Sequence, residues 1–298
     1  PQGTTEKKQR WNAGVGAYLT WQIRQIEKEL SITEPVSIGG EVGEVGGSNI
    51  PSDEAYVAEV RVYLTMLQAR LVQYDPSAIG ISKVSLNTGS AHGGVMGADG
   101  TLQRNVPIGF GIHAGVAKIE NPWFPGSKGF VTVQHGASTL AAELFFAFAG
   151  ANVGEVHLAT EFQNIIWAVI KVQDPALYDV MRERLVSAPK SDIPSALVKQ
   201  RAKNPAYAED GKIKFLGDKD TVKCLPGILD NMRELATLPD SVYNAIVAAL
   251  VAKFEDIFVR FRLNQAGTQL SDSEAAQVAQ IIAANRRSAP ATTTTGED

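Results

Sequence analysis

Histidine, glutamate and glycine residues recur directly after short β-branched segments of this chain, a pattern that suits metal or anion chemistry. The segment 131–134 reads as a buried strand, and His135, Gly136 and Ser138 follow it. A histidine can bind a metal ion, and small residues let backbone N–H groups and a hydroxyl approach an anion at the start of the next helix. In α/β proteins, catalytic residues are commonly found between a strand and the helix that follows it.

Three further segments repeat this arrangement. Glycine-rich or polar residues follow the strands that we predict at 35–40, 81–86 and 156–160. Because each successive pair of strands is separated by enough residues for a helix, the chain is predicted to form successive βα units with parallel strands. The polar residues after the strands would then share one edge of the sheet.

Three of these residues could hold a metal ion together. Glu41, His92 and His135 each follow a different predicted strand, and one glutamate with two histidines suits a catalytic zinc with an open coordination position. Each residue also has an ordinary alternative when it is considered singly, because a glutamate in a turn is often solvated and a histidine is often structural. A further histidine, His113, is expected at the surface or in loop packing.

The order of three motifs resembles the C-terminal half of the class II, zinc-dependent fructose-bisphosphate aldolases, a TIM-barrel family. These motifs are EVGEVGG (41–47), SAHGG (90–94) and QHGAST (134–139), and the resemblance covers about residues 4–167. It implies an α/β fold, a TIM (β/α)8 barrel of which this chain holds the C-terminal four βα units. The first four units would then lie upstream of Pro1.

The resemblance also assigns ligand contacts residue by residue. The glycines that bind phosphate and a monovalent cation in the family fall on Gly93 and Gly136, and the phosphate-binding serine falls on Ser138. The implied cofactor is Zn²⁺. Its three ligands fall on the set already named, Glu41, His92 and His135.

The last strand departs from the family where the substrate would bind. The family has an Asn and an Asp there that bind dihydroxyacetone phosphate, whereas this chain has His157 and Ala159. We therefore regard His157 and the neighbouring Thr160 as candidate substrate contacts. The resemblance therefore implies the ligand set but does not specify the sugar, because the residues that would recognise it have changed.

The position of the catalytic base also departs from the family. An acidic run follows the first motif in the family, whereas this chain has Ser48 and Asn49, which leaves Glu44 and Glu161 as candidate bases. The implied activity is zinc-dependent cleavage of a phosphorylated ketose to dihydroxyacetone phosphate and an aldehyde, as in glycolysis. The alternatives are a sugar-phosphate epimerase, an aldolase with another substrate, or a catalytically silent structural subunit.

Composition limits the other classes of function. The chain has 298 residues, of which 44% are hydrophobic and 20% are charged, so it can bury a sizeable core. A net charge of -4 argues against nucleic acid as a partner. We predict neither a membrane span nor a signal peptide, and the single Cys224 fits the cytoplasm. The expected ligand is a small sugar phosphate, and the resemblance implies a homodimer.

The pattern along the chain predicts three parts. Residues 1–172 would form the barrel half, 173–284 a helical extension that packs on it, and 285–298 a disordered polar tail. A hairpin is expected over 106–110, within a long loop that could serve as a lid. The first helix, over about residues 5–30, carries an apolar face that comprises Trp11, Val15, Tyr18, Leu19, Ile23 and Ile26.

Overall fold

The structure is a computed structural model of the chain. It describes residues 5–43, 51–90, 95–96, 102–125, 129–138, 140–187, 208–209, 212–213, 237–265 and 269–285. At its centre lies a 4-stranded parallel sheet, formed by β1 (Gly39–Val42), β2 (Lys83–Leu86), β5 (Val131–Gln134) and β6 (Val153–Val156). The strand order is β1-β2-β5-β6, so each strand is added at the same edge. The prediction of an α/β fold with parallel strands is therefore confirmed.

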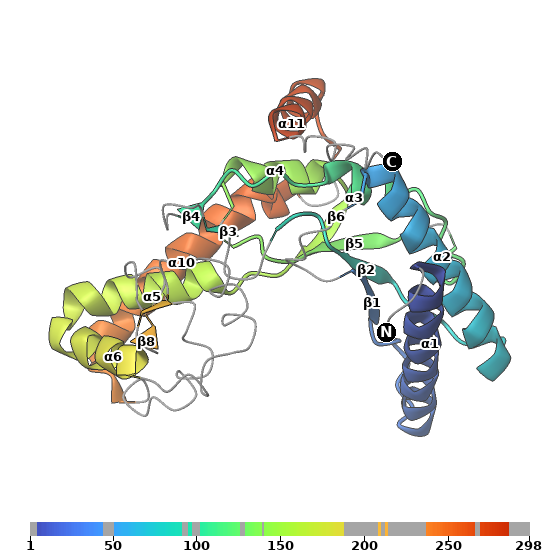
Figure 1. The fold of residues 1–298 in the computed structure, drawn as a ribbon, viewed down its shortest axis with the longest axis horizontal. Helices are drawn as coiled ribbons and strands as arrows, with labels where there is room; N and C mark the ends of the chain where they lie inside the picture. Colours follow the sequence, from blue (N-terminus) through green and yellow to red (C-terminus); the bar gives the residue numbers. More distant parts are fainter. Residues whose placement is uncertain are drawn as a thin grey trace, which may run out of the picture.

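Helices connect these strands. The first, α1 (Thr5–Glu29), precedes β1, and α2 (Asp53–Tyr74) links β1 to β2. Two shorter helices follow, α3 (Phe110–Val116) before β5 and α4 (Glu143–Gly150) before β6. Figure 1 shows α2, α3 and α4 along one side of the sheet, with α1 packed beside α2.

The last strand of the sheet lies earlier than the sequence predicts. We expected it over 156–160, whereas β6 ends at Val156 and α5 (Thr160–Gln173) begins at the residue where the strand was expected to end. Gly154 interrupts the pattern of strand-forming residues in the sequence, because glycine has a low strand propensity. Gly154 lies close to the neighbouring strand, since an added Cβ would lie 2.5 Å from Val131 Cγ1 and one of the two side chains would have to shift.

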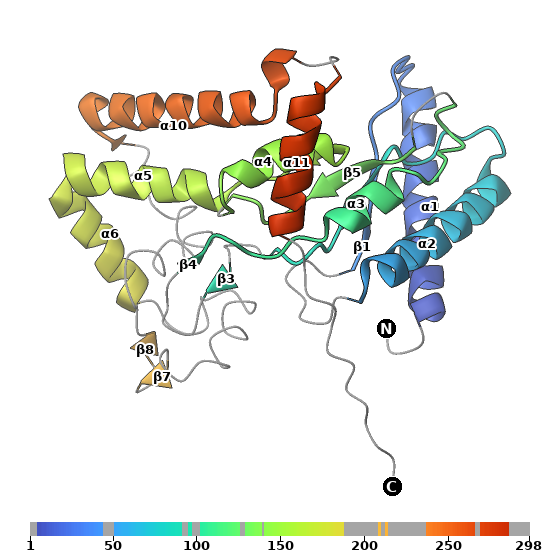
Figure 2. The same ribbon diagram turned by 90° about the horizontal axis from the view of Figure 1, so that it is seen from above.

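The C-terminal helices pack on the helical layer. Figure 2 shows α10 (Asp240–Arg260) along α5, with α6 (Pro175–Ser187) after α5 and α11 (Asp272–Ala284) across α4. A short 3-10 helix, η4 (Leu263–Gln265), follows α10. Just after α11, Asn285 accepts a hydrogen bond from Ile108 N at 2.7 Å. The rest of the predicted polar tail, 286–298, lies outside the described residues.

Two small hairpins lie outside the main sheet. One pairs β3 (Val95–Met96) with β4 (Leu102–Gln103), and the other pairs β7 (Ala208–Glu209) with β8 (Lys212–Ile213). The hairpin expected over 106–110 is wrong. Its apolar residues are buried because they pack against α4, and Phe110 begins α3.

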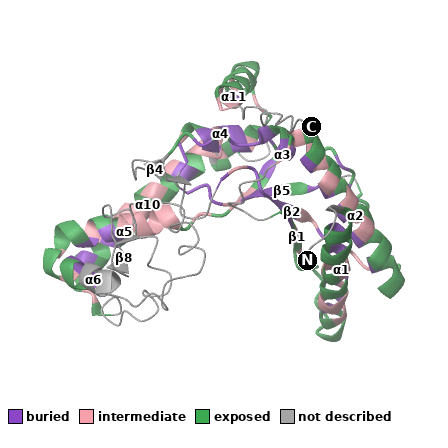
Figure 3. Cartoon of the chain, in the orientation of Figure 1, coloured by how far each residue is buried: buried purple, intermediate pink, exposed green. Residues whose placement is uncertain are grey.

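The first helix buries its small and polar face and exposes its apolar one. Its most buried residues include Ala13, Ala17 and Thr20, which lie against α2. On the predicted apolar face, Trp11 is 64% exposed and Leu19 is 54% exposed. Figure 3 shows this exposed surface along α1. An apolar surface of this size commonly marks an interaction site.

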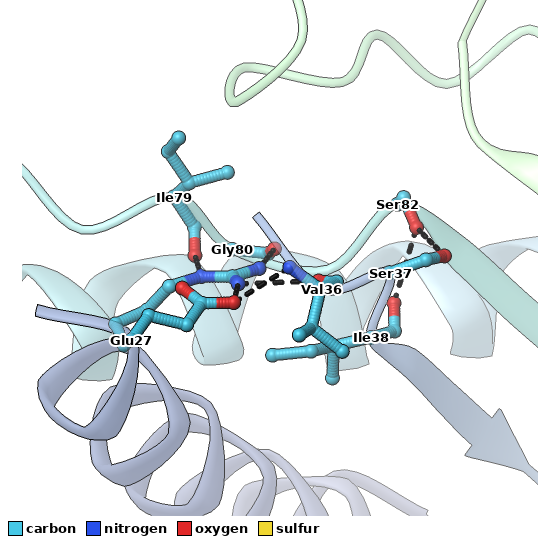
Figure 4. Close-up of polar contacts among 8 residues, drawn as sticks. Glu27, Val36, Ser37, Ile38, Ile79, Gly80 and Ser82 are labelled. Atoms are coloured by element: carbon cyan, nitrogen blue, oxygen red, sulfur yellow. Dashed lines mark hydrogen bonds and ion pairs between the residues drawn. The ribbon is translucent and has the colours of Figure 1, made fainter. Parts of the chain in front are cut away.

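A buried ion pair anchors α1 to the amino ends of β1 and β2. Arg24 Nη1 donates to Glu27 Oε1 at 2.6 Å, and Arg24 Nε donates to Ile79 O at 2.7 Å. Figure 4 shows Glu27 beside Val36, whose N–H donates to the Glu27 carboxylate at 2.6 Å. Burial raises the pKa of Glu27, but the hydrogen bonds from Arg24 and Val36 outweigh it and hold the pKa below its ordinary value. The pair thus lies at the end of the sheet opposite the candidate functional residues.

Replacement of Arg24 should destabilise the protein strongly. Arg24→Met leaves the buried Glu27 carboxylate without its cation and should lower the free energy of unfolding by about 3 kcal/mol. Urea denaturation would measure the loss. The double variant Arg24→Met/Glu27→Met should recover much of it, because no unpaired charge remains. Lys28→Ala is the matched control, since Lys28 pairs with Asp75 through a side chain that is 61% exposed. Equal losses in Arg24→Met and Lys28→Ala would contradict the anchoring role.

Candidate functional site

The strand register places the candidate residues on one face of the sheet, and the core residues between them on the other. Glu41, Ser85, Val133 and Glu155 lie in one row across the four strands. The alternate residues, such as Leu86 in β2, pack against the helices. Continuing this row by two residues in β5 and β6 places His135 and His157 beyond the carboxyl ends of the strands, on the same face as Glu41.

Tyr56 of α2 fixes the end of the strand that carries Glu41. Its hydroxyl donates to Val42 O and accepts a hydrogen bond from Asn87 N at 2.9 Å, which ties β1 to the segment after β2. Gly43 follows with φ 85°, and an added Cβ there would lie 2.5 Å from Tyr56 Oη. The Glu41 side chain itself is exposed.

A pair of imidazole rings lies at the carboxyl ends of β5 and β6. The ring centroids of His135 and His157 are 4.3 Å apart. A register shift between Thr132 and Val133 in the pairing with β6 places Glu155 opposite Val133, which brings His157 beside His135. From the sequence, His135 was expected directly after a strand and His157 within the strand 156–160, so this contact was not predicted.

Glu155 orients the His157 ring. Its Oε1 accepts a hydrogen bond from His157 Nε2, and its Oε2 lies 2.5 Å from Lys83 Nζ. These hydrogen bonds, first that from His157 and then that from Lys83, hold the pKa of Glu155 below its ordinary value. With Nε2 donating to the carboxylate, a neutral His157 ring keeps Nδ1 as its acceptor atom, which is the arrangement typical of metal-binding and catalytic histidines.

The segment after β5 forms a tight turn rather than the start of a helix. Gly136 has φ 63°, a backbone conformation that residues other than glycine rarely adopt. Leu140 N donates to Ala137 O at 3.0 Å, and Ser138 is buried. The helix expected to follow this segment directly begins later than predicted, because α4 starts at Glu143. Any anion bound here would contact the turn itself.

Thr160 and Glu161 lie in the first turn of α5. The helix begins at Thr160, and Ala159 at its N-cap supplies no side-chain hydrogen bond. The Glu161 carboxylate faces α10, where Lys253 Nζ lies 3.9 Å from its Oε1. Thr160 is three residues from His157 in the sequence. The Glu161 side chain, in contrast, is directed towards α10.

His113 lies in the core behind the candidate site. It was expected at the surface or in loop packing, but it is 0% exposed and belongs to α3. Its Nδ1 lies 3.0 Å from Thr132 Oγ1, and its Nε2 lies 2.8 Å from Gln134 Oε1. Burial lowers the pKa of His113 to about 4, although the bond to Gln134 and the charge of Asp53 oppose this shift. The sequence offers one hint of this burial, since His113 lies among apolar and small residues in the segment FGIHAGV.

The buried neutral state of His113 should make stability depend on pH. The unfolded chain titrates this group near pH 6.5 and the folded chain only near 4, so the unfolded state binds more protons between these values. Stability should therefore be full above pH 6.5 and fall by up to about 3 kcal/mol as the pH decreases towards 4. Urea denaturation across this range would measure the loss. In His113→Gln this part of the pH dependence should disappear. An unchanged pH profile in that variant would contradict the assignment.

Three predicted site residues lie outside the described residues, namely Glu44, His92 and Gly93. Within the part of the chain that the structure describes, no group of three or more His, Cys, Asp or Glu side chains could hold a metal ion. The structure brings His135 and His157 together and places Glu41 on the same face of the sheet. The complete predicted ligand set therefore stays a prediction.

Comparison with known proteins identifies no family for this chain. No model of a known protein family matches it, and no curated protein matches it significantly. Among the helices that the structure describes, none combines the length and apolar character that crossing a membrane requires.

Proposed function

We propose that this chain forms the metal-binding half of a zinc-dependent class II aldolase, which cleaves a phosphorylated ketose to dihydroxyacetone phosphate and an aldehyde. The observation that carries the proposal is the sequential parallel sheet, with Glu41 and His135 on one face at or beyond the carboxyl ends of its strands. A sheet that adds each strand at the same edge is the arrangement of half of a TIM (β/α)8 barrel. The fold and the ordered motifs thus support the same reading.

The donor set fits zinc in its chemistry. One carboxylate and two imidazoles are common zinc ligands, and in this proposal they come from Glu41, His92 and His135. A zinc ion bound there would act as a Lewis acid on the ketose carbonyl and hydroxyl oxygens. The chain would orient its ligands through backbone contacts such as the hydrogen bond that Asn12 Nδ2 donates to Glu41 O at 2.8 Å.

Phosphate recognition is assigned to the turn after β5 and to the segment after β2. Gly136 and Ser138 would offer a backbone N–H and a hydroxyl to a phosphate oxygen, with Gly93 contributing from the other segment. A monovalent cation would lie beside these glycines. Such anchoring would hold the reacting carbons in position and would let remote binding energy lower the barrier.

The proton-transfer residue is assigned by position. Glu44 and Glu161 are the candidates. Because Glu161 contacts Lys253 on α10, we favour Glu44 as the base and would substitute it first. His157 would contact the substrate where the family uses an amide side chain. Because an imidazole held by Glu155 differs from an amide in shape and polarity, this site favours a different ketose from that of fructose-bisphosphate aldolases. An aldolase with another substrate, or a sugar-phosphate epimerase, is therefore the second candidate.

Zinc binding is the first test of the proposed function. The purified chain should bind close to one zinc ion, and His135→Ala and Glu41→Ala should each remove most of it, as measured by elemental analysis and calorimetry. Lowering the pH should also release the metal, since ligating histidines must be neutral. Glu143→Ala is a control, because this exposed carboxylate lies in α4. Absence of zinc from the wild-type chain, with all variants folded, would leave the silent-subunit reading in its place.

We also propose that a second copy of the chain covers the exposed apolar face of α1. This face comprises Trp11, Val15, Tyr18, Leu19 and Ile26. Elsewhere on α1, Asn12 donates to Glu41 O of β1 at 2.8 Å. Among the described strands β1 pairs with β2 alone, so its other edge is a second surface that a partner could contact. The homodimer implied by the aldolase resemblance gives this surface an occupant, and the resemblance also favours a cytoplasmic protein.

The oligomeric state should depend on this face. Light scattering of the purified chain should give about twice the monomer mass of 31.9 kDa, because burial of a large apolar surface favours association. Leu19→Glu should give the monomer mass. Val259→Glu is the matched control, since Val259 is an exposed apolar residue on α10 (63%). A monomeric wild-type chain, or equal dissociation by both variants, would contradict the assignment.

A further inference from the structure

The side-chain amide of Gln134 is the centre of a buried hydrogen-bond network. Gln134 is 0% exposed. Its Oε1 accepts from Thr88 Oγ1 at 2.7 Å and lies 2.8 Å from His113 Nε2. Its Nε2 donates to Ser90 Oγ at 2.7 Å and to His135 O at 2.6 Å. Two acceptor and two donor positions are thus occupied, which is the full capacity of an amide.

The hydrogen bonds determine which end of the Gln134 side-chain amide is Oε1 and which is Nε2. A carbonyl oxygen can only accept, so the NH2 end of Gln134 must face His135 O, and Oε1 must then face His113. His113 Nε2 therefore carries the proton, and it donates to Gln134. An isosteric carboxylate would keep the acceptor end of the network but would place an oxygen against His135 O.

The same bonds fix the orientation of the peptide group after His135. His135 O accepts from Ser90 Oγ at 2.5 Å as well as from Gln134 Nε2, so this carbonyl is directed towards the buried network. In a trans peptide the C=O and the following N–H point to opposite sides. The Gly136 N–H is therefore directed away from the network. The φ of 63° at Gly136 continues the turn from this orientation.

One amide also joins the segments from which two candidate metal ligands come. Gln134 directly precedes His135, and its partners Thr88 and Ser90 lie in the segment after β2, shortly before His92 in the sequence. A change in the amide would therefore act on both segments together.

We propose that Gln134 is a positioning residue, which holds the His135–Gly136 peptide and the segment after β2 so that metal and phosphate donors are presented together. This inference rests on the proposed zinc- and phosphate-dependent function. In this proposal Gln134 contacts neither the zinc ion nor the phosphate. It acts through the backbone of His135 and through Ser90, while His113 holds it from behind.

Zinc affinity and amide exchange of the 298-residue chain would test the proposal together. In Gln134→Leu and Gln134→Glu, zinc affinity measured by calorimetric competition with a chelator should fall by roughly 10–100-fold. Amide hydrogen exchange over 135–138 should accelerate in the same variants. Ser90→Ala removes one bond to His135 O and should cause a smaller change in the same direction, which keeps the test available if Gln134→Leu does not fold.

Asn121→Leu is the matched control. Asn121 is 3% exposed, and its amide donates to Ile81 O at 3.3 Å, before β2 and away from His135. It should lower stability without changing zinc affinity or exchange over 135–138. Equal changes in Asn121→Leu, or unchanged zinc affinity and exchange in the Gln134 and Ser90 variants, would overturn the proposal. If the wild-type chain binds no zinc while the exchange differences persist, the proposed function fails and the positioning of the peptide by Gln134 stands.

Discussion

The parallel register of four neighbouring strands determines where the candidate residues lie. Because β1, β2, β5 and β6 run in one direction and follow one another across the sheet, their carboxyl ends meet at one edge. Glu41 and His135 therefore lie at the same end of the sheet although 94 positions separate them in the sequence. The strand register also places them on the same face. Reversal of the direction of one strand would place the residues that follow it at the opposite end of the sheet.

The two ends of the sheet use buried polar contacts for different purposes. At the amino ends, the Arg24–Glu27 pair bonds the backbone carbonyls before β2 and holds α1 in place. At the carboxyl ends, His113 and Gln134 form a neutral network whose bonds are directed at the peptide that follows β5. A neutral network avoids the desolvation cost of a buried charge, and it fixes geometry because each donor has one partner.

Much of the fold could be predicted from local patterns, whereas the details of the site could not. The apolar pattern over about residues 5–30 predicted α1, and the β-branched run 131–134 predicted β5. The early position of β6 was missed because Gly154 interrupts the strand pattern, and the burial of His113 depends on contacts with residues distant in sequence. The apolar face of α1 was predicted, but an apolar stripe does not specify what covers it, and Trp11 and Leu19 on this face are exposed. The contact of His135 with His157 depends on the register shift in the pairing of β5 with β6, which no single strand reveals.

X-ray absorption at the zinc edge of the zinc-loaded chain would test the central claim most directly, because it identifies the ligand atoms. The proposed site predicts two imidazole nitrogens with oxygen ligands, and one fewer imidazole in His135→Ala. A zinc–sulfur distance of about 2.3 Å would place the metal on Cys224 instead. Such a spectrum, or an imidazole count unchanged in His135→Ala, would contradict a catalytic zinc at the carboxyl ends of these strands.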